Sequence, residues 1–268
     1  ARRLAPKMSE LVHHCQSAFI KRRCIQDNLY FQNVIREAHS KKKPTIFLRL
    51  DFAKAFDTIE HTPIINIMKH MGFNDKWLSW IRSIFSSGCS SILLNGVPGR
   101  QFRCHRGVRQ GDLLSPLIFV LAADLLQSAI NDAFRNGLIQ LPFPSNGQMD
   151  YPIVQYADDT ILLMPACPRQ ALIIKNILTN YARSIGLKIN FHKSTLIPIN
   201  LDQQLAMQIA LIFECPVGAM PFTYLGIPLG TSRPTIQDFM PLVCSIESSL
   251  SSTLSLMSHA GKLTLLNS

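Results

Sequence analysis

The sequence predicts an α+β protein in which helices pack on one face of a sheet. Strand-like and helix-like apolar segments are mixed along the chain, without the regular strand–helix alternation that predicts a parallel α/β sheet. The 268 residues are 47% hydrophobic and 16% charged, which allows a large core and argues against disorder. We expect one large domain or two small ones.

In the first third of the chain we expect a helix, a buried strand and two more helices. Residues 9–40 carry a helical pattern, and residues 45–50 form a β-branched and aromatic run that ends at Asp51. The two later helices are bounded by capping and stop residues, which are Thr62–Pro63 with Gly72, and Asn74 with Gly88.

The rest of the chain continues this mixture. Residues 90–95 and 100–105 flank turn-forming dipeptides and predict a hairpin. We expect helices, strands and turns at the following places: a long apolar helix from Ser115 to about Phe134, two short strands within 152–164, a helix from Arg169 to Ile185 closed by Gly186, strand–turn–strand over 187–199, a helix over 202–213, a hairpin at Tyr224–Gly226 and a helix near 236–257.

The basic balance of the chain suits a polyanionic partner. Lys and Arg outnumber Asp and Glu by 27 to 17, and the formal net charge is +10. Such a surface gains affinity for nucleic acid by releasing counterions from phosphates, although a merely solvated basic surface has the same composition. No apolar run of about 18 residues is present, so we expect no membrane segment.

The 7 cysteines are scattered and form no C-x-x-C pair, which fits a reducing compartment and gives no local zinc signature. His13-His14-Cys15 could suggest a metal cluster. Adjacent residues diverge too much for easy shared ligation, so we expect no metal there.

Three aspartates are the candidate catalytic residues. Asp51 ends a predicted buried strand, and Asp158-Asp159 lies between two short apolar strands. If these strands are neighbours in one sheet, the carboxylates meet at its edge, where they repel one another until metal binds. Phosphoryl transfer by two divalent ions needs such a cluster. The alternative is that Asp51 caps a helix and Asp158-Asp159 forms a polar turn.

The chain closely resembles reverse transcriptases, of the type found in plant LINE-type (non-LTR) retrotransposons. Gln16–Asn28 is similar to that family's fingers motif. Motifs A to E are matched in order by Asp51–Asp57 (DFAKAFD), Arg106–Pro116 (RGVRQGDLLSP), Tyr156–Asp159 (YADD), Gly186–Ser194 (GLKINFHKS) and Tyr224–Gly230 (YLGIPLG).

The resemblance implies a right-hand polymerase with fingers, palm and truncated thumb, whose antiparallel palm sheet is backed by helices. Residues 1–45 would be partial fingers, 46–234 the palm with interleaved fingers elements, and 235–268 the start of the thumb. The implied partners are an RNA template, a DNA primer and dNTPs, with two Mg²⁺ ions, or Mn²⁺ in their place. The parent polypeptide would also carry an endonuclease, and insertion would take place in the nucleus.

The resemblance also implies roles at the catalytic centre. Asp51, Asp158 and Asp159 would bind the metals, together with the backbone carbonyl of Phe52. Phe56 would sit under the sugar and exclude a 2′-hydroxyl; its alternative role is core packing.

Further residues would bind nucleotide and nucleic acid. Gln110 and Gly111 would contact the incoming nucleotide, and Arg23 would reach its triphosphate. Lys193 would protonate the departing pyrophosphate, or is a solvated lysine. The residues expected along the nucleic acid are Arg106 and Arg109, and the primer-gripping turn Tyr224, Leu225 and Gly226.

Two positions depart from the family pattern. Arg22 stands where the family has Gly, and would be strained if that position needs a positive φ. Leu113 replaces a Pro. These departures leave open a decayed or repurposed element that only binds nucleic acid. A group II intron-type maturase is a third reading, but the hairpin sequence Leu94–Arg100 favours the LINE type.

Overall fold

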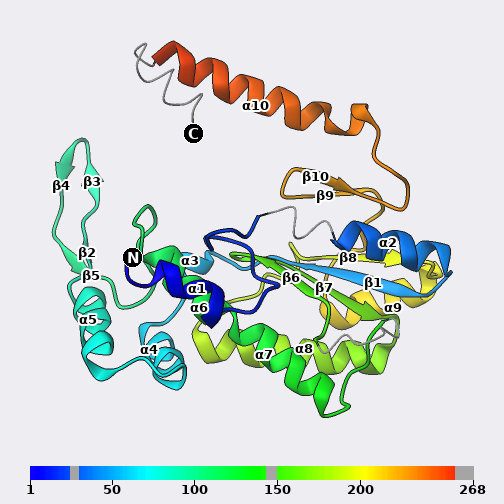
Figure 1. Ribbon diagram of the computed structural model, residues 1–268, viewed down its shortest axis with the longest axis horizontal. Helices are drawn as coiled ribbons and strands as arrows, with labels where there is room; N and C mark the ends of the chain where they lie inside the picture. Colours follow the sequence, from blue (N-terminus) through cyan, green and yellow to red (C-terminus); the bar gives the residue numbers. More distant parts are fainter. Residues whose placement is uncertain (25–29, 143–149, 257–268) are drawn as a thin grey trace.

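A four-stranded antiparallel sheet lies at the centre of the computed structural model, which describes residues 1–24, 30–142 and 150–256 (Figure 1). The strand order is β6-β7-β1-β8. The strands are β1 (Thr45–Leu50), β6 (Ile153–Tyr156), β7 (Asp159–Pro165) and β8 (Thr195–Ile199). The predicted strand at 45–50 and the two strands within 152–164 are therefore confirmed.

The central strand β1 is buried on both faces. Ile46, Leu48 and Leu50 face one hydrophobic core, whereas Phe47 faces a second core on the opposite side. This alternation follows from the two-residue period of a strand. It explains why residues 45–50 are a continuous apolar run rather than an alternating one.

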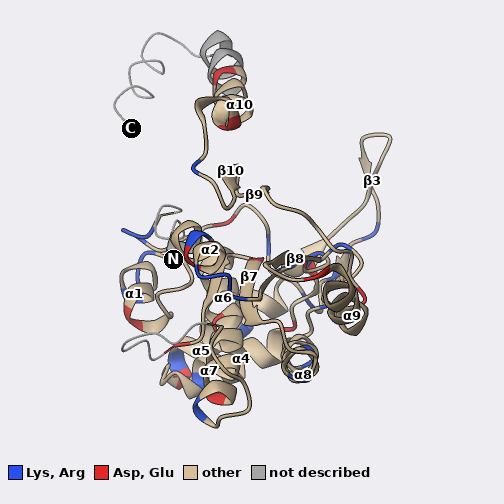
Figure 2. Cartoon of the chain, turned by 90° about the vertical axis from the view of Figure 1, so that its right-hand side faces the viewer, with Lys and Arg blue, Asp and Glu red and all other residues tan. Residues whose placement is uncertain are grey.

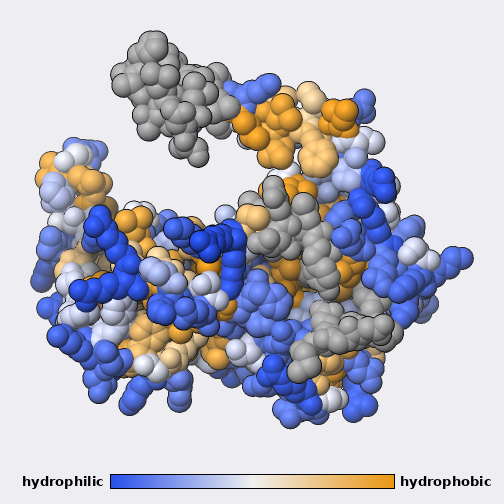
Figure 3. All heavy atoms as spheres, in the orientation of Figure 1, coloured by the Kyte–Doolittle hydropathy of each residue, from blue (hydrophilic) through white to orange (hydrophobic). Residues whose placement is uncertain are grey.

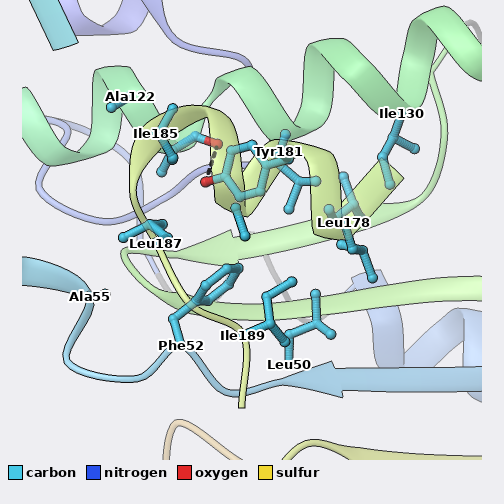
Figure 4. Packing of buried hydrophobic residues seen from close by; sticks show 14 of the residues in the cluster. Leu50, Phe52, Ala55, Ala122, Ile130, Leu178, Tyr181, Ile185, Leu187 and Ile189 are labelled. Atoms are coloured by element: carbon cyan, nitrogen blue, oxygen red, sulfur yellow. Dashed lines mark hydrogen bonds between the residues drawn. The ribbon is translucent and has the colours of Figure 1, made fainter. Parts of the chain in front are cut away.

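Helices cover one face of the sheet as a thick layer. Tyr181 in α8 packs edge-on against Phe52 just beyond β1, with ring centroids 6.2 Å apart, and its hydroxyl contacts the carbonyl of Ala123 at 3.5 Å (Figure 4). The helices of this layer are α6 (Ser115–Ala123), α7 (Leu125–Arg135), α8 (Pro168–Ile185) and α9 (Gln203–Phe213). Helices α4 (His61–His70) and α5 (Asp75–Ser86) lie beyond the end of the sheet, where α4 packs on α6 and α8 (Figure 1). Three short helical elements, η1 (Ala5–Lys7), α1 (Met8–Leu11) and α3 (Ala55–Thr58), lie near the end of the sheet (Figure 1).

The opposite face is also covered, which corrects the prediction of helices on one face only. Helix α2 (Tyr30–Ser40) and the hairpin of β9 (Phe222–Tyr224) and β10 (Ile227–Leu229) lie over it. Val34, Ile35 and Tyr224 close the second core there. Beyond this hairpin, α10 (Ile236–Leu256) runs across the top of the view, above the body and separated from it (Figure 1). The predicted helix near 236–257 is thus present, with residue 257 outside the described residues.

A narrow hairpin projects from the body beside α5 (Figure 1). Its turn uses Asn95 and Gly96, both with positive φ (50° and 82°), as a tight turn between antiparallel strands requires. It confirms the hairpin predicted around 90–105, and is built from β2 (Cys89–Ser90), β3 (Leu93–Leu94), β4 (Val97–Pro98) and β5 (Phe102–Arg103).

The predicted helix over 9–40 is wrong as a single helix. Helix α1 ends at Leu11, and Val12 is already extended. Phe19 and Arg22 then adopt positive φ (59° and 70°), which no helix tolerates. The segment around Gln16 pairs with β6 instead, so a long-range contact overrides the local helical pattern.

Two other boundaries differ from the sequence prediction. Helix α4 begins at His61 with Glu60 in the capping place, so Thr62 is not its N-cap. The amide of Glu60 donates to the carbonyl of Ile185 (2.9 Å), which fixes the helix start earlier. Only 195–199 of the predicted strand–turn–strand is a strand, because β1 ends before it can pair with the first half, where Phe52 and Ile189 form a single bridge.

One helical stretch, Ser115–Arg135, is long and apolar enough to cross a membrane by length and composition. However, 72% of its most apolar window is buried inside the protein. It comprises α6 and α7 and confirms the predicted long apolar helix. We interpret it as a core helix of the layer that covers the sheet.

Candidate active site

The sheet brings the three candidate aspartates to one end. Leu50 is paired with Thr160 in the β1–β7 ladder, so Asp51 and Asp159, one residue further on, leave the sheet at the same end. Tyr156 is paired with Asp159, and the two residues between them, Ala157 and Asp158, form the tight turn of the β6–β7 hairpin. The predicted clustering of carboxylates from separate strands is therefore present in the fold.

The charges at this end of the sheet repel one another. Burial raises the pKa of Asp158, and nearby Asp51 raises it further, against a backbone hydrogen bond that lowers it. Burial also raises the pKa of Asp159, as do Asp158 and Asp51, while Arg49 opposes them. Carboxylates that disfavour their own ionisation gain most from a bound cation.

Asp51 is held by the segment that follows α8. The amide of Asp51 donates to the hydroxyl of Ser194 (3.0 Å), and the carbonyl of Asp51 accepts from the amide of Asn190 (2.8 Å). The Ser194 hydroxyl in turn donates to the carbonyl of Asn190 (2.9 Å). Ser194 is fully buried and was not predicted as a site residue, because only the folded chain shows that it faces Asp51.

Lys193 immediately precedes Ser194 and is exposed. Its amide donates to Asn190 (3.1 Å) in a turn, which brings its backbone to the Asp51 end of the sheet. The Lys193 side chain is exposed to solvent. Phe52, whose carbonyl was predicted to bind metal, follows Asp51 directly, and its ring is buried in the core (Figure 4).

The loop before α6 is bonded tightly to α3. The amide of Val108 donates to the carbonyl of Phe56 (2.7 Å), and that of Gly107 to the carbonyl of Ile59 (2.7 Å). Gly107 has φ +80°, and a Cβ there would lie 2.7 Å from the carbonyl oxygen of Asp57. This close approach requires Gly. It brings Gln110 beside Phe56, with the Gln110 amide 3.4 Å from an Asp57 carboxylate oxygen.

Phe56, Gln110 and Gly111 line one cavity of about 720 Å³, together with Phe19 and Leu113. Phe56 is half-buried and stacks on Phe119, with ring centroids 4.3 Å apart and planes tilted by 16°. The stacking fixes the ring orientation at the cavity wall. The structure thus brings together Phe56, Gln110 and Gly111 from among the residues predicted to contact the nucleotide, whereas Phe52 and Arg23 do not line this cavity. Leu113, which departs from the family pattern, is exposed at the same cavity.

Arg106 and Arg109 line a second cavity of about 560 Å³, between α5, the projecting hairpin and the loop before α6. Both side chains are exposed. Gln110 contributes to both cavities. The predicted nucleic-acid contacts therefore lie next to the predicted nucleotide contacts.

Arg23, which was predicted to contact the triphosphate, hydrogen-bonds the N-terminal segment in this structure. Its guanidinium donates to four backbone carbonyls of the N-terminal segment, at 2.6–3.1 Å, which are those of Ser9, Val12, His13 and Gln16. These bonds use the terminal N–H groups that a phosphate would need. Arg23 is a structural clamp in this arrangement.

The β9–β10 turn is joined to the carboxylate end of the sheet. The Tyr224 hydroxyl contacts the carbonyl of Asp159 (3.5 Å), and Arg49 reaches the carbonyl of Thr223 (3.4 Å). Burial raises the pKa of Tyr224, whose ring is 6% exposed. Tyr224 therefore positions the turn from inside, while Leu225 and Gly226, both with positive φ, form its outer tip.

His13, His14 and Asp150 have ligand atoms within 4.8 Å of one another. His13 Nε2 lies 2.8 Å from Asp150, which also accepts from Asn131 at 2.8 Å. Cys15 points away from the histidines, and its thiol donates to Gln127 (3.0 Å). The adjacent side chains of His13 and His14 therefore do converge, with Asp150 as the third group, contrary to the expectation that neighbouring residues diverge; Cys15 is not part of this group.

Comparison with known proteins agrees with this architecture. Residues 1–229 match the family model described as reverse transcriptase (RNA-dependent DNA polymerase). A retrovirus-related Pol polyprotein from a type-1 retrotransposable element R2 of Popillia japonica is 25% identical over 232 residues, which are 82% of this chain and 37% of that protein. Another from the same organism is 29% identical over 179 residues, which are 65% of this chain and 24% of that protein. The chain thus spans only about a quarter to two fifths of these relatives.

Solved telomerase structures share the fold. Apo telomerase from Candida tropicalis, truncated from its C-terminal domain, superposes with a TM-score of 0.60 at 14% identity, covering 86% of this chain and 43% of that one. Telomerase from Candida albicans gives 0.57 at 15% identity, covering 85% of this chain and 36% of that one. The predicted right-hand polymerase fold is therefore confirmed. With 1–229 of its 268 residues matched by the family model, the chain belongs to the reverse transcriptase (RNA-dependent DNA polymerase) family.

Proposed function

We propose that this chain is the catalytic core of an RNA-directed DNA polymerase, which extends a primer 3′-hydroxyl with dNTPs by two-metal phosphoryl transfer. The observation that carries the proposal is the meeting of Asp51, Asp158 and Asp159 at one end of the sheet, with raised pKa values at Asp158 and Asp159. Membership of the reverse transcriptase family supports the same chemistry.

The donor set fits Mg²⁺. Carboxylate oxygens are the ligands that Mg²⁺ prefers, and it takes the rest of its shell from water and substrate phosphates. Asp51, Asp158 and the carbonyl of Phe52 would hold the ions, with Asp159 assisting, and Mn²⁺ could replace Mg²⁺. The bound ions would activate the attacking hydroxyl and stabilise the leaving group.

The nucleotide would occupy the cavity beside Phe56. Phe56 stacked on Phe119 offers a rigid wall for the sugar, and Gln110 offers an amide in the same cavity. Gly111 has φ +89° and lets backbone approach the ligand closely. Exposed Lys193 would donate a proton to the departing pyrophosphate.

The template–primer duplex would lie in the broad hollow between the projecting hairpin, the body and α10 (Figure 3). Arg106 and Arg109 supply positive charge beside the nucleotide cavity, and Leu225 and Gly226 would touch the primer end. In this scheme residues 1–45 are partial fingers, 46–234 the palm with interleaved fingers elements, and 235–268 the start of the thumb, of which 257–268 lie outside the described residues.

The parent protein would be the polyprotein of a non-LTR retrotransposon, of the plant LINE type that the motifs resemble, and would carry an endonuclease. Similarity to R2 Pol polyproteins supports a multidomain parent, because this chain spans only part of them. Arg22 favours a second candidate, a decayed element that binds nucleic acid without polymerising, since it strains the fingers segment.

Primer extension on an RNA template with dNTPs and Mg²⁺ tests the proposal. Asp158→Asn removes a metal ligand and should lower the extension rate by about a thousandfold, equivalent to about 4 kcal/mol of transition-state stabilisation. Asp132→Asn, an exposed carboxylate on α7, should leave the rate unchanged. Normal activity of Asp158→Asn would refute the metal assignment, and binding without extension by the unaltered chain would favour the decayed element.

Phe56→Val tests the sugar contact separately. A smaller side chain opens the cavity wall beneath the sugar, so incorporation of rNTPs relative to dNTPs should rise about tenfold or more, equivalent to about 1.4 kcal/mol. Single-nucleotide incorporation with matched rNTP and dNTP measures this ratio. Unchanged sugar discrimination would assign Phe56 to core packing with Phe119.

A further inference from the structure

The segment at Cys15–Ser17 adds an extra edge to the central sheet. The amide of Gln155 donates to the carbonyl of Cys15, and the amide of Ser17 to the carbonyl of Gln155, both at 3.0 Å. Gln16 and Gln155 form a parallel bridge between these bonds. A stretch far upstream in the sequence is therefore fixed beside β6, the strand that leads into the turn with Asp158.

The Gln16 side chain binds both backbone groups of Ala157. Its carbonyl oxygen accepts from the Ala157 amide (2.9 Å), and its amide donates to the Ala157 carbonyl (3.2 Å). The same oxygen also accepts from the Ala18 amide (3.0 Å). Gln16 is fully buried, so these groups compete with no solvent. A primary amide has the donor and acceptor that this pairing needs.

Ala157 has an unfavourable backbone conformation that requires such support. Its φ is +56°, in the left-handed region where a Cβ is costly, and it carries a side chain where Gly would fit freely. Strained conformations persist only where the surroundings fix them, and they cluster at functional sites. Ala157 directly precedes Asp158, so its φ and ψ set the direction in which the Asp158 carboxylate leaves the turn.

Gln16 is itself anchored by Arg23. The guanidinium of Arg23 donates to the carbonyl of Gln16 (2.8 Å) and of His13 (2.6 Å), which fixes the backbone from which the Gln16 side chain projects. A continuous chain of hydrogen bonds thus runs from Arg23 through Gln16 to Ala157. It ends next to the carboxylates.

We propose that Gln16 is a positioning residue for the metal site, which holds Ala157 in its left-handed conformation and so orients Asp158 and Asp159. This inference rests on the proposed metal-dependent function. Gln16 touches no reacting atom in this scheme; it acts through the backbone of Ala157. Metal binding should therefore depend on Gln16 even though the residue offers the metal no ligand.

The test compares Gln16→Met with Gln127→Met. Both remove a fully buried amide and keep a side chain of similar length. Gln127 lies on α7, where it bonds Asn131 (2.9 Å), the carbonyl of Tyr151 (3.2 Å) and the thiol of Cys15 (3.0 Å), but not Ala157. A purely structural role predicts the same behaviour for both variants, namely lower resistance to urea with unchanged Mg²⁺ dependence.

The positioning role predicts a tenfold or greater rise in the Mg²⁺ concentration for half-maximal primer extension with Gln16→Met, and no such rise with Gln127→Met. Equal Mg²⁺ dependence in the two variants would overturn it. Gln16→Glu keeps the acceptor for the Ala157 amide and loses the donor, so it provides a second variant if Gln16→Met fails to fold. The Mg²⁺ concentration for half-maximal extension by Gln16→Glu should lie between the values for the unaltered chain and Gln16→Met. A value equal to that of the unaltered chain would count against the proposal.

A readout without catalysis separates this inference from the proposed function. Hydrogen exchange of the Ala157 amide should be at least tenfold faster in Gln16→Met than in the unaltered chain, while amides in β1 keep their protection. Binding of Mn²⁺, followed by its paramagnetic effect, should weaken in parallel. If the unaltered chain extends no primer, the proposed function fails; unchanged exchange and unchanged Mn²⁺ binding would refute the role of Gln16.

Discussion

At the scale of single residues, the non-glycine positions with positive φ are those where the fold holds the backbone in a conformation that a Cβ makes unfavourable. The sequence predicts strain at Arg22 if that position needs a positive φ. Arg22 has φ +70°, so the condition is met. Ala157 and Lys54 are further examples, at the turn that carries Asp158 and at the start of α3. Two of these three adjoin the predicted site, in line with the tendency of strain to gather at functional sites.

Arg22→Gly should stabilise the protein by about 1 kcal/mol, because Gly adopts positive φ without the steric cost that a Cβ imposes. Arg22 is exposed, so little packing is lost. Urea denaturation measures the change in the free energy of unfolding. Lys21→Gly, at the exposed basic neighbour outside the positive-φ positions, should be neutral or destabilising; equal gains for both variants would remove strain as the explanation.

The residues that could be predicted are those whose role follows from local sequence. Asp51 at a strand end and Asp158-Asp159 between strands were found in this way, and the resemblance supplied Phe56 and Gln110. Gln16 and Ser194 were not singled out as site residues, because their roles arise from contacts with residues 141 and 143 positions away. Arg23 was assigned to phosphate for the same reason: its carbonyl partners depend on a non-helical path that the local pattern did not indicate.

At the scale of elements, the ends of helices decide how the site loops are held. Asp112 lies just before α6 and accepts from the amides of Leu114 and Ser115, both at 2.6 Å, and from the Ser115 hydroxyl at 2.7 Å. Burial opposes its ionisation, but these hydrogen bonds and nearby Arg109 lower the pKa of Asp112 overall. The carboxylate thus supports the loop that carries Gln110 and Gly111.

Asp112→Ala should lower the free energy of unfolding by about 1 kcal/mol at pH 7, the usual cost of losing such a capping side chain. Since the folded-state pKa is depressed, the contribution is complete above the ordinary Asp pKa of about 4 and is lost as pH falls through the lower folded value. Urea denaturation of both proteins from pH 7 downwards should show a constant difference that shrinks below about pH 4. A difference that persists in acid would contradict a charge-dependent cap, and Asp132→Ala serves as the exposed control.

Element predictions succeeded where capping and burial agree. The strand at 45–50 and the helix closed by Gly186 were found because an uninterrupted apolar run and a left-handed C-cap are local signals; Gly186 has φ +76°. The helix over 9–40 failed because pairing of Gln16 with β6 outweighs helical propensity, which is worth only a fraction of about 1 kcal/mol per residue. The sequence predicted helices on one face of the sheet only. The cover of the opposite face by α2 and the β9–β10 hairpin depends on long-range packing against Phe47, which no local pattern indicates.

At the scale of the whole molecule, the net charge of +10 is spread over many elements rather than gathered on one helix (Figure 2). The fold nevertheless selects which charges would meet nucleic acid. Arg106 and Arg109 line a cavity beside the nucleotide residues, whereas Arg183 is exposed on α8, in the helix layer behind the sheet. The proposed duplex site thus depends on where basic residues lie and not on their number.

This placement predicts a difference in salt dependence. Each phosphate contact that is lost should reduce the slope of log affinity against log salt by about 0.7–0.9, because fewer counterions are released on binding. The double variant Arg106→Gln, Arg109→Gln should therefore lower the slope by roughly 1.5 and weaken binding of RNA–DNA duplexes regardless of sequence. Fluorescence anisotropy over a salt series measures the slope. Arg183→Gln should leave it unchanged, and a slope equally reduced by Arg183→Gln would mean that the duplex is held by the overall charge, with no defined path past the nucleotide cavity.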